Sequence, residues 1–158
     1  MANSIRHQIM DAVIAALKGI TVDNGYQTNV VTVSEELKHW EEMAFTDFPA
    51  CFPIDADEVK EQSAITRMQS RLTVIVTSMV HDHKTAPHRG DANESMRLAR
   101  TNLLRDVEKA LMNNTTLAGL DVFTTPRRVV TDKGNIPNYS IFDQEFEILY
   151  HYTRLNGG

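Results

Sequence analysis

Hydrophobic residues follow two different periods along this chain, and these periods predict both helices and strands. Apolar positions recur every three to four residues between positions 5 and 20, as in an amphipathic helix, and Ser4 is suited to cap it. The same period returns between Glu94 and Leu111. The apolar stripe of this second helix comprises Met96, Ala99, Leu103, Val107, Ala110 and Leu111. We therefore expect two principal helices, each with one face in the core.

Strands are predicted where the period falls to two. In residues 71–81 both alternating faces are mostly uncharged, which is typical of a strand that is covered on both sides or paired centrally. Between Phe142 and Tyr152, aromatic and aliphatic residues alternate with polar, mainly acidic ones, so one strand face is expected to meet solvent or a partner. Further strands are expected at residues 26–33 and 121–131, the latter interrupted by Pro126. Residues 45–54 contain Pro49 and Pro53, which predicts an edge strand or an extended segment.

The segments between these elements differ in composition. Residues 55–70 are charged and weakly periodic, and we interpret them as a loop. Residues 82–93 contain no apolar side chain larger than alanine, which predicts a flexible loop. Asn24-Gly25 and Lys133-Gly134 mark turns. Short turns favour antiparallel pairing, so we expect residues 1–158 to form one α+β domain with a mainly antiparallel sheet packed by two principal helices.

Composition and charge narrow the range of functions. The 158 residues fit one domain, and the formal net charge of −5 argues against a dedicated nucleic-acid binder. The single cysteine, Cys51, has phenylalanine and proline neighbours, which favours a buried structural thiol and a reducing compartment such as the cytosol. We see no signal-peptide pattern and no apolar run near the ~20 residues of a membrane helix, so we expect a soluble protein without membrane contact.

Two charged clusters raise the question of a metal site. His81 and His83 would point the same way in an extended segment, with His88 nearby, and imidazoles bind zinc. Such a site needs further ligands and rigid supporting residues, so we interpret the cluster as part of a solvated loop. Asp55, Asp57 and Glu58 lack the glycine and distal glutamate of a calcium loop, and we interpret them as a solvated charge run. We therefore expect no metal and no cofactor.

A basic pair follows Pro126 in a predicted strand. Arg127 and Arg128, with Lys133 after them, could contact phosphates or a neighbouring subunit's acidic strand bearing Glu145 and Glu147. They could equally be charges that keep an exposed strand edge soluble. We find no phosphate loop, nucleophile elbow, dinucleotide fingerprint or paired-cysteine zinc motif, and we expect a protein that is not an enzyme.

Several short segments occur in an order that resembles a known family. In order they are Leu17-Lys18-Gly19-Ile20, Asn24-Gly25-Tyr26, Phe48-Pro49-Ala50, a valine-rich strand, Leu104-Arg105-Asp106-Val107, Thr116-Leu117-Ala118-Gly119-Leu120 and Phe146-Glu147-Ile148-Leu149-Tyr150. This order resembles the tail terminator (tail completion) proteins of tailed bacteriophages, the group that includes the minor tail protein U of lambda-like phages. The resemblance extends over almost the whole chain, and its specificity lies in the order of the segments.

The resemblance implies a virion structural protein with an α+β fold. Such proteins form a ring, usually six-fold, at the head-proximal end of the tail tube, where the ring stops tube polymerisation and docks the tail to the head connector. The implied partners are further copies of the chain, the tail tube protein and the connector or neck protein, with DNA only passing through the lumen. The implied location is the tail or neck of the virion, and the host cytoplasm during assembly.

Within that function we expect the contacts to come from the predicted loop and from the charged strands. The candidate interface residues are His81, Asp82, His83, Lys84, Arg89, Arg127, Arg128, Lys133, Glu145 and Glu147. Three alternatives stay open. The chain could be another neck or head-completion (stopper) protein, a small metal-dependent enzyme that uses His81 and His83, or a host-side binding module.

Overall fold

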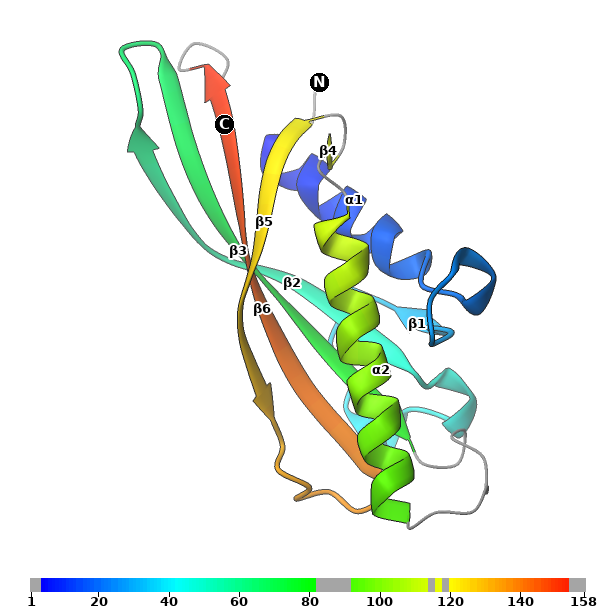
Figure 1. The fold of residues 1–158 in the computed structure, drawn as a ribbon. Helices are drawn as coiled ribbons and strands as arrows, with labels where there is room; N and C mark the ends of the chain where they lie inside the picture. Colours follow the sequence, from blue (N-terminus) through cyan, green and yellow to red (C-terminus); the bar gives the residue numbers. More distant parts are fainter. Residues whose placement is uncertain (1–3, 82–91, 114–115, 118–119, 154–158) are drawn as a thin grey trace.

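Two helices pack on one face of a long, twisted sheet in the computed structural model of the chain (Figure 1). The structure describes residues 4–81, 92–113, 116–117 and 120–153. Helix α1 is Ile5–Lys18 and helix α2 is Ala92–Met112. The predicted α+β class and the two principal helices are therefore confirmed, and α2 begins inside the segment that was expected to be a loop.

The sheet is mixed, with the strand order β1-β2-β3-β6-β5-β4. The strands are β1 (Thr32–Val33), β2 (Ala50–Gln62), β3 (Arg67–His81), β4 (Thr116–Leu117), β5 (Leu120–Thr131) and β6 (Tyr139–Thr153). Every neighbouring pair is antiparallel except β1 and β2, which are parallel. β3 lies between β2 and β6, which agrees with its predicted central pairing.

The main core lies between the helices and the sheet. Ser4 caps α1, because its hydroxyl accepts a hydrogen bond from the His7 N–H at 3.3 Å. The predicted stripe of α2 is inward-facing, with Leu103, Val107 and Leu111 fully buried. The sheet residues that meet the helices are also buried, and they include Leu72, Val74, Val76, Phe146 and Ile148. Burial of these apolar side chains stabilises the α1–α2–sheet arrangement.

The second face of the sheet is covered only at one end. There, residues 40–48 pack Met43 and Phe48 against Phe52 and Met79. Beyond this cluster the register aligns outward-facing residues from four strands, which we call the open face. Its residues are Ile54 and Val59 of β2, Arg71, Thr73 and Ile75 of β3, Glu145, Glu147 and Leu149 of β6, and Phe123, Arg128 and Val130 of β5. β3 is therefore only partly covered on this second side.

Several strand predictions need correction. Residues 55–70 are not a loop, because β2 and β3 form a continuous hairpin that pairs as far as Gln62 and Met68. Only residues 32–33 of the predicted strand at 26–33 are a strand, and residues 45–47 form a short 3₁₀ turn before β2 begins. The hairpin, which we call the arm for residues 57–71, projects past the helices together with the end of β6 (Figure 1).

Candidate interaction surface

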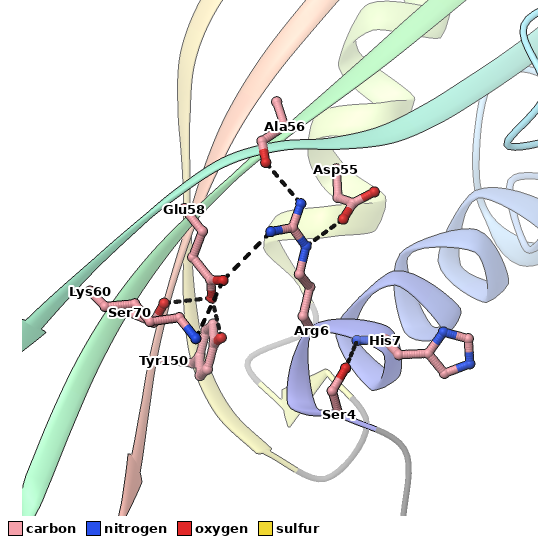
Figure 2. A network of polar contacts seen from close by, with 9 residues as sticks. All are labelled: Ser4, Arg6, His7, Asp55, Ala56, Glu58, Lys60, Ser70 and Tyr150. Atoms are coloured by element: carbon pink, nitrogen blue, oxygen red, sulfur yellow. Dashed lines mark hydrogen bonds and ion pairs between the residues drawn. The ribbon is translucent and has the colours of Figure 1, made fainter. Parts of the chain in front are cut away.

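A polar network fixes the base of the arm to α1 (Figure 2). The Arg6 guanidinium, on the first turn of α1, donates to the Asp55 carboxylate and, at 2.9 Å, to the Ala56 carbonyl. Its Nη1 lies 3.6 Å from Glu58 Oε2. Asp55 and Glu58 border a register shift in the β2–β3 pairing, and this irregularity turns both carboxylates toward Arg6. One arginine therefore joins the helix to the strand where the arm begins.

Glu58 is the acceptor at the centre of this network. Its Oε1 accepts hydrogen bonds from the Ser70 hydroxyl at 2.6 Å and from the Tyr150 hydroxyl, and Lys60 Nζ lies 3.7 Å from Oε2. The Glu58 side chain is only 9% exposed. The prediction of a solvated charge run is thus wrong for Glu58 and Asp55, while Asp57 between them is exposed.

The network also shifts the pKa values of Glu58 and Tyr150. Burial alone would raise the pKa of Glu58, but the hydrogen bonds from Ser70 and Tyr150 and the charges of Lys60 and Arg6 together lower it below the ordinary value. Burial, followed by the hydrogen bond to Glu58, raises the pKa of Tyr150 to about 12. Glu58 is therefore an ionised acceptor and Tyr150 a neutral donor near neutral pH, which suits a fixed structural junction.

Four of the predicted interface residues meet on strands β5 and β6. Arg127 Nη2 donates to Glu147 Oε1 at 2.5 Å, and Arg128 lies opposite Glu145 in the strand register. The register of β5 and β6 shifts between Pro126 and Arg128, so two consecutive arginines reach the acidic strand. These acidic and basic residues are thus neighbours within one chain. Whether they also contact another subunit stays a prediction.

The other predicted interface residues are separated from this group. His81 is buried at the end of β3 and contacts the rings of Phe45, Phe48 and Tyr139, with centroid distances of 4.6, 5.9 and 4.5 Å. Its place at the end of the predicted strand 71–81 is therefore confirmed, whereas the expectation that its side chain lies in a solvated loop is wrong. Lys133 is exposed in the turn after β5, in a left-handed conformation with φ 57°.

Asp82, His83, Lys84 and Arg89 lie outside the described residues. Among the residues that the structure does describe, no group of three or more histidine, cysteine or acidic side chains is arranged to hold a metal ion.

Cys51 lies in the core, as its apolar neighbours predicted. Its Sγ is 3.6 Å from the Ser78 hydroxyl, and burial raises the pKa of the thiol to about 12. A thiol of this kind is protonated and inaccessible near neutral pH, which agrees with a structural role.

Exposed apolar side chains on the open face and the arm are the feature that sequence reasoning missed. Phe123, Ile54 and Val59 are all more than half exposed, and Ile65 at the tip of the arm is 86% exposed. Ile65 lies in the connection between β2 and β3, where turn residues are usually polar, and this was the available signal. Apolar side chains gathered on one face mark protein contact surfaces more often than single scattered ones do.

A cavity of about 310 Å³ lies between β5 and α2. It is lined by Glu108, Pro126, Arg127, Arg128, Val129, Gln144, Glu145 and Phe146. Gln144 is 1% exposed; its Nε2 donates to the Leu104 carbonyl at 3.0 Å, and its Oε1 accepts no hydrogen bond within the described part of the chain. This side of β5 therefore combines apolar surface with an unsatisfied buried acceptor.

Comparison with known proteins adds no assignment. The sequence matches no protein-family model and no curated protein. Within the described ranges, no helix combines the length and the apolar character needed to cross a membrane.

Proposed function

We propose that this chain is a ring-forming tail terminator of a tailed bacteriophage. One side of the ring binds the last ring of the tail tube, and the other side lacks the surface that would recruit another tube subunit and instead meets the head connector. The protein then acts by capping, without catalysis, metal or cofactor. The ordered sequence segments from Leu17-Lys18-Gly19-Ile20 to the terminal strand support this proposal over nearly the whole chain.

The observation that carries the proposal is the open face with its projecting arm. A sheet covered by helices on one side and bearing exposed Ile54, Val59 and Phe123 on the other has a large surface suited to protein partners. The Arg6–Glu58 network holds the arm at a fixed angle to the body, so a partner would meet a preorganised surface. An assembly subunit needs both properties.

Electron microscopy of the purified protein mixed with tail tubes tests the proposal. We expect rings of uniform diameter, seated at one end of each tube. Binding to connectors but never to tube ends would instead identify a neck or stopper protein. A protein that forms no ring and binds no tube end would contradict the terminator function.

A matched pair of valines tests the part of the open face that lies on the arm. Val59 lies on the open face and is 55% exposed, and Val22 follows α1 and is 54% exposed. Val59→Ser should reduce ring formation or tube-end binding, whereas Val22→Ser, with the same chemical change, should behave like wild type. If the two variants formed rings and bound tube ends equally well, this part of the open face would not be a contact surface of the assembly.

A further inference from the structure

Both long edges of the sheet are unpaired over much of their length. On one side, β4 pairs only with Leu120 and Asp121, so no described strand lies beyond residues 122–131 of β5. On the other side, β1 pairs only with Ala50 and Cys51 of β2. Arg6 occupies the Ala56 carbonyl, so the free edge of β2 runs from Asp57 to Gln62. Free edges of this length are templates for pairing with another strand.

The β5 edge has one protected half and one receptive half. Pro126 lacks an N–H group and the register shifts beside it, which hinders pairing in the middle of the strand. Residues 127–131 then follow without a proline. Val129 lies across from the inward-facing Gln144 and Val130 across from the outward-facing Asp143, yet both valines are more than 40% exposed. A strand added here would cover apolar surface on both sides of the sheet.

The cavity beside Gln144 also favours strand addition at residues 127–131. It lies along β5 on the helix side, and its lining includes Val129 and Phe146. Side chains of an added strand would enter it on alternate positions, within reach of the Gln144 oxygen that accepts no hydrogen bond from the described residues. A donor from that strand would satisfy the buried acceptor.

The two edges have opposite charge. Along the free edge of β2, residues 57–62, the exposed charges are Asp57 and Glu61 against the single base Lys60, because Glu58 is held in the Arg6 network. Residues 122–131 of β5 contain Arg127 and Arg128 and no acid. Contact between the free β2 edge of one copy and the free β5 edge of another would therefore bring an acidic edge to a basic one, whereas two β5 edges or two β2 edges would repel each other.

Strand direction is compatible with this arrangement. Successive antiparallel pairings through β3 and β6 make β2 and β5 run in opposite directions. A neighbour in the same orientation would thus present its β2 antiparallel to β5 of the first copy. Because the register within one chain places residues 128–131 level with residues 51–54 of β2, the neighbour must also be shifted along the strands to bring its residues 57–62 beside them. We infer that residues 127–131 of one copy pair with residues 57–62 of the next, forming a head-to-tail contact that closes into a ring. This inference rests on the proposed ring function and names its subunit interface.

A charge exchange across the two edges tests the contact. Arg128→Asp and Glu61→Arg should each lower the fraction of protein in rings at least tenfold at limiting concentration, measured by native mass spectrometry or by ring counts at tube ends, because antiparallel pairing brings Glu61 beside Arg128. The double variant Arg128→Asp/Glu61→Arg should recover ring formation. Arg97→Asp, which makes the same charge change on the exposed side of α2, serves as the control. All three positions are exposed, so each variant should unfold at the wild-type denaturant concentration.

Hydrogen exchange supplies a second readout that does not depend on the variants. The amides of residues 57–62 and 127–131 should exchange more slowly in the wild-type ring than in the dissociated protein. Wild-type rings with unchanged exchange at both edges, or rings unaffected by either single charge reversal, would overturn the edge pairing and leave the terminator function intact. A wild-type protein that forms no ring, alone or on tubes, would overturn both.

Discussion

Glu58 lies at the point where α1, β2, β3 and β6 meet, and its carboxylate accepts hydrogen bonds from two other strands. Glu58→Ala removes this acceptor and leaves the Ser70 and Tyr150 hydroxyls without their partner. Because unsatisfied buried polar groups are costly, we expect the free energy of unfolding to fall by about 1–3 kcal/mol. Urea denaturation would measure the loss, provided that the free energy of unfolding decreases with urea concentration at the same slope in both proteins.

Asp57 provides the control for this substitution, since it is the neighbouring acid on the same strand and is exposed. Asp57→Ala should change the free energy of unfolding by less than about 0.5 kcal/mol. If both alanine variants were equally stable, the network at the base of the arm would have no structural importance.

The pH dependence of stability should report on the same carboxylate. The pKa of Glu58 in the folded protein is lowered. Its contribution to stability is therefore fully present well above the unfolded-state pKa of about 4.3 and disappears as the pH falls through the folded-state pKa. The difference in unfolding free energy between wild type and Glu58→Gln should be constant near neutral pH and shrink below about pH 4. A difference that grows as the pH falls would show that folding does not lower the pKa of Glu58.

At the scale of the elements, predictability from sequence follows from how many faces of each element are buried. α2 and β6 each bury one face, so their apolar residues recur with a helical or strand period that can be read directly. The β2 half of the arm has both faces exposed beyond Glu58, so this part of the hairpin leaves no such period in the sequence. Its strands are held by pairing with the neighbouring strands and by the Arg6 network, which are contacts distant in the sequence.

The candidate interface residues show the same limit. Arg127 and Arg128 stood out as a basic pair and Glu145 and Glu147 as an acidic strand, but their contact depends on the register shift after Pro126. His81 was predicted correctly as the end of a strand, but its side chain was expected in solvent because the polar residues after it predict a loop. The aromatic rings that bury it come from Phe45, Phe48 and Tyr139, far away in the sequence.

Helix α2 allows a matched test of its stripe. Leu103 is fully buried and Leu98 is exposed on the same helix. Leu103→Ala should lower the free energy of unfolding by about 2–5 kcal/mol, because a cavity remains in the core. Leu98→Ala should have an effect of less than about 0.5 kcal/mol. Thermal or urea unfolding of the two variants would measure the contrast, and equal losses would contradict the assigned inward face.

At the scale of the whole molecule, helices on one side leave the other side and both long edges of the sheet for partners. The open face supplies exposed apolar residues, and the arm extends this surface beyond the body. The acidic edge of β2 and the basic edge of β5 have the complementarity required for repeated head-to-tail contacts. These features together favour an assembly subunit, which is the proposed role.

The most direct measurement of that role is the length of tail tubes that polymerise in the presence of this protein. Tube protein from the same phage would be allowed to elongate with and without the purified chain, and lengths would be measured by electron microscopy. We predict that elongation stops after the protein is added and that each arrested tube has one ring at its growing end. Tubes that continue to lengthen at the same rate, with bare ends, would contradict the proposed function.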